Sequence, residues 1–135
     1  MSLSAHARQQ AGLWGTDPSG WAALAEPHNE ALFEAVLDAA GVTGGTRLVD
    51  VGCGTGRALP ALAAAVGPGG RVLGFDVTPA MLEAARDAGR NGCAGLVLAD
   101  ARRLPLPDGI AGLVFAAGLV QHLPDPEAGW WNWPG

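Results

Sequence analysis

Three aspartates each stand where a predicted strand ends, and their spacing brings them together. Asp50, Asp76 and Asp100 follow short apolar runs and lie about 25 residues apart. Each interval fits one strand–helix–strand unit of about 30 residues, so we expect the three acids at one edge of a parallel sheet. Because clustered carboxylates repel one another, such an edge indicates a site for a ligand with hydroxyl, amino or cationic groups.

A glycine-rich turn connects the first of these strands to a predicted helix. Residues 47–57 read RLVDVGCGTGR, with glycines at Gly52, Gly54 and Gly56. Glycines allow a sharp turn there and let backbone N–H groups approach a ligand. The dinucleotide fingerprint G-x-G-x-x-G needs its third glycine where this chain has Arg57, which disfavours a nicotinamide cofactor.

The segment 50–56, D-V-G-C-G-T-G, resembles motif I of the class I S-adenosylmethionine-dependent methyltransferases, specifically their small-molecule branch. The resemblance spans about residues 26–129. It implies S-adenosyl-L-methionine as the cofactor and a small molecule as the methyl acceptor. It also implies that Asp50 supports the glycine turn and the methionine end, that Asp76 binds both ribose hydroxyls, and that Asp100 faces the adenine amino group.

Further residues complete the site that the resemblance implies. Val77 and Met81 would pack on the adenine, and the Ala101 N–H would face a ring nitrogen. Ala117 and Gly118 would approach the methionine moiety through their backbone. The whole implied cofactor-binding set is Asp50, Gly52, Cys53, Gly54, Gly56, Asp76, Val77, Met81, Asp100, Ala101, Ala117 and Gly118.

His122 is the candidate catalytic residue, because it is the histidine near the presumed methyl group. It would act as a general base for an O–H or N–H nucleophile. A sulfonium methyl is already activated, however, so a purely steric contact with substrate or cofactor is the favoured alternative. Cys53 and Cys93 have neither metal nor redox spacing, and we expect no metal site.

The elements that would position these residues alternate between helix and strand. Apolar periodicity predicts helices from Pro27 to Gly41, around Leu59 to Val66, and from a Thr78 cap to Gly89. Strands are predicted over 48–51, 71–75, 96–98 and 110–117. The fold class is therefore α/β, a partial doubly wound parallel sheet with flanking helices. The resemblance makes these the first four strands of the methyltransferase fold, in the order 3-2-1-4.

The chain divides into three parts. Residues 1–25, interrupted by glycines and Pro18, are expected to form a mobile leader or a lid, and 26–129 form an incomplete methyltransferase core. The tail at 130–135 carries three tryptophans. We hypothesise a frame shift there, because the alternative reading of its codons gives an amphipathic helix. The chain would then lack strands five to seven, leaving an open strand edge that favours a homodimer or aggregation.

Length, net charge and hydropathy limit the functions that the chain can have. The length of 135 residues allows one domain, and the net charge of −5 disfavours nucleic acid as a partner. No segment is long and apolar enough to span a membrane, so a cytoplasmic protein without membrane contact is expected. The predicted function is methyl transfer from S-adenosylmethionine to a small molecule. The alternatives are an inactive fragment serving as a nucleoside-binding or interaction module and, less favoured, an NAD-type oxidoreductase domain.

Overall fold

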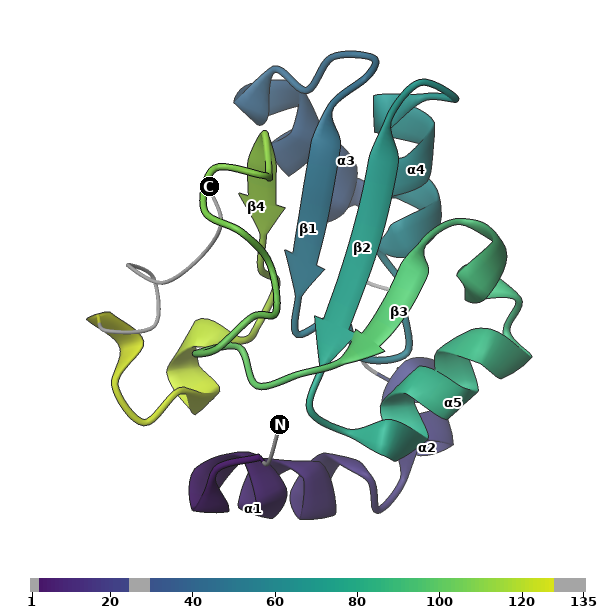
Figure 1. The fold of residues 1–135 in the computed structure, drawn as a ribbon. Coiled ribbons are helices and arrows are strands. Elements are labelled where there is room, and N and C mark those ends of the chain that lie inside the picture. The colour runs from purple at the N-terminus through teal and green to yellow at the C-terminus, as the bar shows by residue number, and fades with distance from the viewer. Residues whose placement is uncertain (1–2, 25–29, 128–135) are drawn as a thin grey trace.

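A parallel four-stranded sheet forms the centre of the molecule, in a computed structural model that describes residues 3–24 and 30–127 (Figure 1). Its strand order is β3-β2-β1-β4, as predicted. The strands are β1 (Arg47–Val51), β2 (Arg71–Asp76), β3 (Gly95–Leu98) and β4 (Leu113–Phe115). All three pairings are parallel. The three predicted aspartates therefore stand at or just beyond the carboxyl ends of β1, β2 and β3.

Two helices cover one face of the sheet. These are α3 (Glu30–Ala40) and α4 (Leu59–Val66), which lie behind the strands in Figure 1. Phe33 of α3 packs edge-to-face on Phe115 of β4, with ring centroids 5.8 Å apart. Pro60 is accommodated because it falls in the first turn of α4, where its missing N–H has no helical partner to lose. This face forms the larger apolar core.

The opposite face is covered by loops. Val49, Val51 and Phe75 are buried there against Ala99 and Ala101, which begin the long loop between β3 and β4. Several strand residues of this face are only partly buried. The helix-covered face of the sheet is thus more completely buried than the loop-covered face.

Short helices connect β2 to β3 and follow β4. Helix α5 (Pro79–Asp87) follows β2 and buries Met81, Leu82 and Ala85. Thr78 stands at its N-cap position as predicted, without a side-chain capping bond. The helix ends at Asp87, and Gly89, with φ +76°, leads into the 3-10 helix η2 (Arg90–Gly92). A second 3-10 helix, η3 (Val120–His122), follows β4.

The N-terminal segment is helical, which corrects the expectation that its glycines and proline prevent helices. Helix α1 (Ala5–Trp14) runs through Gly12, and α2 (Pro18–Leu24) begins at the proline and contains Gly20. Ser4 caps α1 by accepting a hydrogen bond from the Ala7 N–H at 3.1 Å. In Figure 1, α1 lies beneath the carboxyl ends of the strands.

Two other expectations were partly wrong. Strand β4 has three residues where eight were predicted, because β1 offers a partner only from Arg47 and the chain turns away at Gly118, with φ +70°. Apolar periodicity predicts that Leu32, Phe33, Val36 and Leu37 all face the sheet. Helix α3 buries Phe33 and Leu37, but Leu32 and Val36 are 58% and 42% exposed. The predicted helix start at Pro27 and the tail at 130–135 lie outside the described residues.

No helix in the part of the chain that the structure describes has the length and apolar character needed to cross a membrane.

Candidate cofactor site

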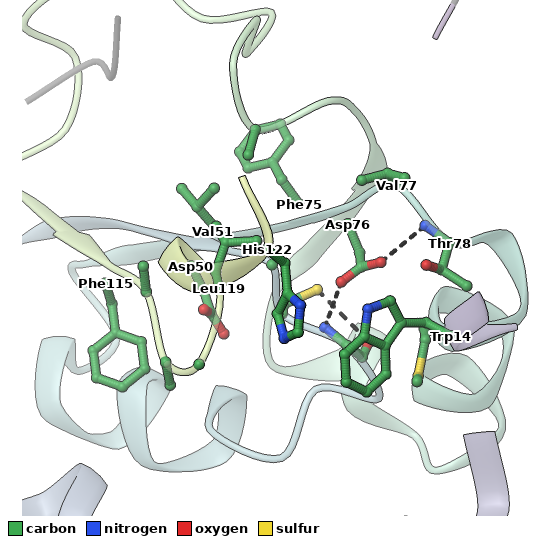
Figure 2. Close-up of a pocket in the computed structure, with 18 of the residues that line it drawn as sticks. Trp14, Asp50, Val51, Phe75, Asp76, Val77, Thr78, Phe115, Leu119 and His122 are labelled. Atoms are coloured by element: carbon green, nitrogen blue, oxygen red, sulfur yellow. Dashed lines mark hydrogen bonds between the residues drawn. The ribbon is translucent and has the colours of Figure 1, made fainter. Parts of the chain in front are cut away.

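One cavity of about 760 Å³ opens at the carboxyl ends of the strands and collects the predicted residues (Figure 2). Asp50, Asp76 and Asp100 all line it, so the three strand ends converge as expected. The other predicted residues that line it are Gly52, Cys53, Gly54, Val77, Met81, Ala101, Ala117, Gly118 and His122. Among the predicted residues, only Gly56 is absent from the lining.

The glycine turn is tied to the end of β2. The N–H groups of Gly52 and Cys53 both donate to the Phe75 carbonyl, at 2.7 and 2.9 Å, and the Gly54 N–H donates to Asp76 at 2.9 Å. The expectation that these N–H groups face a ligand was therefore wrong, because neighbouring protein atoms already accept from them. The turn instead presents backbone without a side chain to the cavity at Gly54. A Cβ on Gly54 would meet no protein atom within 4 Å, so the space beside it is open.

Gly56 has a packing role. Its φ is +80°, and a Cβ there would lie 2.8 Å from Leu59, 3.1 Å from Arg90 and 3.4 Å from Ala85. Only a glycine lets α4 approach α5 and η2 this closely. The third glycine of the turn thus supports the site through helix packing, one residue before Arg57.

Asp76 holds the turn in place while facing the cavity. Its two carboxylate oxygens accept hydrogen bonds from the backbone N–H groups of Gly54 at 2.9 Å and Thr78 at 2.8 Å, drawn as dashed lines in Figure 2. Burial raises the pKa of Asp76, and these N–H groups act against that rise. Each carboxylate oxygen has two lone pairs, so each can accept a further hydrogen bond from a ligand hydroxyl.

Asp50 is the most deeply buried acid of the site, with 2% of its surface exposed. Burial, and then the negative charge of Asp76, raise the pKa of Asp50 to about 7. A carboxyl group in this position is stabilised as an anion when a cation comes close to it. Burial, followed by the charges of Asp50 and Asp76, also raises the pKa of the Cys53 thiol, which disfavours the reactive thiolate.

Asp100 is bound to the N-terminal segment, which sequence reasoning missed. The Ser4 hydroxyl donates to its carboxylate at 2.9 Å, and Arg102 pairs with the same oxygen at 3.2 Å. Arg102 also donates to the Ser4 hydroxyl, at 2.6 Å. Partial burial acts to raise the pKa of Asp100, but the hydrogen bonds from Arg102 and Ser4 outweigh it and hold the pKa below its usual value.

Helix α1 spans the cavity from Asp100 to the segment after β4. The His6 ring donates to the His122 carbonyl at 2.7 Å. The Trp14 ring packs edge-to-face on both His122 and Trp21, with centroids 5.1 and 5.0 Å apart, and Figure 2 shows Trp14 beside His122. All four of these residues line the cavity. The tryptophans in a glycine-rich leader were the available signal for this cover.

Comparison with known proteins identifies the family to which this arrangement belongs. The chain matches a methyltransferase domain family over residues 48–130, more than half of its length. It belongs to this methyltransferase family. The match covers the glycine turn, the three acids and the four strands, except for Arg47 at the start of β1.

Individual relatives agree. The chain is 37% identical over 120 residues to methyltransferase GfsG of Streptomyces halstedii, covering 86% of this chain and 42% of GfsG. It is 34% identical over 96 residues to the ubiquinone/menaquinone biosynthesis C-methyltransferase UbiE of Ectopseudomonas mendocina, covering 66% of this chain and 38% of UbiE. A SAM-dependent methyltransferase from Aquifex aeolicus superimposes with a TM-score of 0.74 at 29% identity, covering 87% of this chain and 65% of that structure.

These comparisons confirm the predicted family, fold class and cofactor. S-adenosylmethionine is the cofactor of this methyltransferase family. The chain spans less than half the length of the two curated relatives GfsG and UbiE. The residues that line the cavity fit S-adenosylmethionine. The cavity volume lies in the range of about 300 to 1,000 Å³ typical of ligand sites, three acids supply acceptors, and Gly54 leaves its surface open. The individual contacts of each residue with the cofactor stay predictions.

Proposed function

We propose that the protein uses this cavity to transfer a methyl group from S-adenosylmethionine to a small-molecule acceptor. The observation that carries the proposal is the convergence of Asp50, Asp76 and Asp100 on one cavity beside the bare glycine turn. When bound, the cofactor supplies an electrophilic methyl group on a sulfonium centre. The task of the protein is then to align an acceptor with that methyl group and to exclude water.

The order of the strands supports a placement of the cofactor along the edge of the sheet, from adenine at β3 to methionine at β1. Asp100 beyond β3 would face the adenine amino group, and Asp76 at the end of β2 would accept from the ribose hydroxyls. Asp50 in β1 would favour the positively charged methionine end. The acceptor would then lie on the β4 side of the cavity, beyond the end of the cofactor that carries the methyl group.

The β4 side of the cavity is mostly apolar. Leu32, Phe33 and Val36 of α3 line it together with Phe115 and Leu119. The exposed apolar residues of α3 thus gain a role as part of an acceptor surface. An acceptor with an apolar ring or chain matches this lining, and the name of the relative UbiE states methylation at carbon in quinone biosynthesis.

His122 stands between α1 and the β4 side of the cavity. Its ring packs on Trp14 and its carbonyl accepts from His6, so structure favours a shaping role over proton transfer. His122→Phe keeps an aromatic ring for Trp14 and removes the base, whereas His122→Ala removes both. We expect the phenylalanine variant to keep most of the activity and the alanine variant to lose it.

The test is formation of S-adenosylhomocysteine from S-adenosylmethionine by the full chain, with small aromatic and isoprenoid acceptors compared with a protein and an RNA. Product formed with a small apolar acceptor, with the expected ranking of the two His122 variants, supports the proposal. Loss of activity in His122→Phe to the level of His122→Ala would establish a base instead. If S-adenosylhomocysteine binds but no acceptor yields product, the chain is a nucleoside-binding module and the proposed activity is wrong.

A further inference from the structure

Arg57 directly follows the glycine turn and lines the cavity. Its Nη2 pairs with Glu30 Oε1 at 2.6 Å, and 31% of its side chain is exposed. Its Nε, in contrast, is shielded from solvent and has no hydrogen-bond partner among the described residues. A buried N–H without a partner is costly, at about 1–3 kcal/mol, so this one indicates a missing acceptor.

The charges that line the cavity are unequal in number. Three acids face it, whereas Arg57 is the one arginine or lysine in its lining among residues 3–24 and 30–127. The cofactor has several groups that a carboxylate attracts or accepts from, but it has a single anionic group, the α-carboxylate of its methionine moiety. The ligand thus has one anionic group, and the described lining of the cavity has one arginine.

Three backbone donors of the glycine turn are not available for that carboxylate. The N–H groups of Gly52 and Cys53 donate to the Phe75 carbonyl, and the Gly54 N–H donates to Asp76. The methionine end of the cofactor is expected beside β1, and Arg57 lies on the segment that leaves β1. Its partner Glu30 begins α3, the helix that packs on β4, so Arg57 stands at this end of the site.

We propose that Arg57 binds the α-carboxylate of the methionine moiety, using its Nε–H and a neighbouring N–H of the same guanidinium. This inference rests on S-adenosylmethionine being the cofactor. An arginine fork matches the two oxygens of a carboxylate, and such charge-assisted pairs are stronger than neutral hydrogen bonds. Lysine offers a point charge in place of the fork, so Arg57→Lys should restore only part of the affinity.

The competing explanation is that Arg57 only ties the glycine turn to α3 through Glu30. The side chain of Glu30 is 63% exposed, and ion pairs at such exposed positions contribute little. The two explanations differ in what Glu30→Gln does, because this variant breaks the ion pair but keeps the guanidinium.

The experiment is calorimetric titration with two ligands that differ in one group. S-adenosylhomocysteine carries the carboxylate, and its decarboxylated analogue, S-adenosyl-3-thiopropylamine, keeps the adenosyl, thioether and ammonium groups. We expect Arg57→Met to weaken S-adenosylhomocysteine binding tenfold to a hundredfold and to change binding of the analogue less than threefold. Glu30→Gln should change either affinity less than threefold.

Other results would contradict either the role of Arg57 or the cofactor site. Equal losses for both ligands in Arg57→Met, matched by Glu30→Gln, would make Arg57 a structural tie and overturn the inference. Equal affinity of the wild-type protein for the two ligands would also overturn it, while leaving the cofactor assignment intact. Failure of the wild-type protein to bind either ligand would instead contradict the cofactor site itself. Retained binding of the analogue shows in each variant that the site is folded.

Discussion

Asp50 is the residue whose environment differs most from that of an ordinary aspartate. It is nearly inaccessible to solvent and shares the cavity with Asp76, and its pKa is raised to about 7. Burying a carboxylate without a cation costs free energy, and a protein retains such a group where function needs it. In this site the positive charge of the cofactor would provide the missing compensation.

The raised pKa predicts how the stability of the ligand-free protein depends on pH. The folded state of Asp50 binds its proton more tightly than the unfolded state, so the free energy of unfolding should fall as pH rises toward 7 and then level off. The raised pKa of Asp76 acts in the same direction, and the lowered pKa of Asp100 acts in the opposite direction at lower pH. Urea unfolding should give about 2 kcal/mol more stability at pH 5.5 than at pH 8.

The control is Asp50→Asn, which is neutral at every pH. This variant should lose most of the difference between the two pH values and should be more stable than the wild-type protein at pH 8. Stability that instead rises from pH 5.5 to pH 8 in the wild-type protein would show that Asp50 is ionised and compensated in the ligand-free state.

At the scale of elements, α1 acts as a cover fixed at both ends. Ser4 joins it to Asp100 beyond β3, and His6 and Trp14 join it to His122 after β4. We propose that α1 is a lid, because its residues His6, Gln10 and Trp14 line the cavity that the ligand would fill. The contacts at its two ends are hydrogen bonds and an edge-to-face ring contact, which suits an element that opens.

The lid predicts that weakening its attachment at Ser4 speeds the release of S-adenosylhomocysteine. Ser4→Ala removes the hydrogen bonds with Asp100 and Arg102 and the cap of α1, a loss of about 1 kcal/mol. The dissociation rate should rise about threefold to tenfold, measured by stopped-flow tryptophan fluorescence. Ser19→Ala, at an exposed position of α2, should leave the rate unchanged.

A second substitution separates the lid contact from the helix cap. Ser4→Gly keeps a residue that is favoured at helix N-caps but removes the hydroxyl that joins Asp100 and Arg102. Faster release in this variant supports the lid contact. A rate equal to that of the wild-type protein would mean that only the stability of α1 matters.

The sheet was predictable from the sequence, and the lid was not, for a physical reason. Strands β1 to β3 are apolar runs whose ends are marked by Asp50, Asp76 and Asp100, so pattern and spacing were sufficient. Helix α1 has small residues and an internal Gly12, and tertiary contacts of Ser4, His6 and Trp14 stabilise it. Such contacts between distant segments are not encoded in local periodicity.

The site itself was predictable as a set of residues but not as a network. The sequence indicated which residues gather, and all but Gly56 line the cavity. It did not reveal that Asp76 accepts from the Gly54 N–H, or that Ser4 and Arg102 bind Asp100. Those bonds depend on side-chain directions that are fixed only when the strand ends and the loops are packed together.

At the scale of the whole molecule, the sheet has an open side. Strand β4 pairs with β1, and no described residue pairs with its other edge. The loop-covered face of the sheet also keeps several partly buried apolar residues. Open edges with apolar surface promote pairing between chains, and we propose that this edge mediates self-association.

Sedimentation velocity over a range of concentrations tests this proposal. The Gly112 N–H donates to Arg47 of β1, so by alternation the Leu113 N–H points to the open edge. Leu113→Pro removes that donor and should shift the population toward monomer. A wild-type protein that stays monomeric at every concentration would show that the edge is not adhesive.

The central claim is that one adenosyl cofactor occupies the cavity where three strand ends meet. The most direct measurement is calorimetric titration of S-adenosylhomocysteine into the wild-type protein, Asp76→Asn and the exposed-residue control Asp87→Asn. The account predicts one binding site, at least tenfold weaker binding in Asp76→Asn, unchanged binding in Asp87→Asn, and no binding of NAD. Absence of binding to the wild-type protein, or equal affinity in Asp76→Asn, would contradict it.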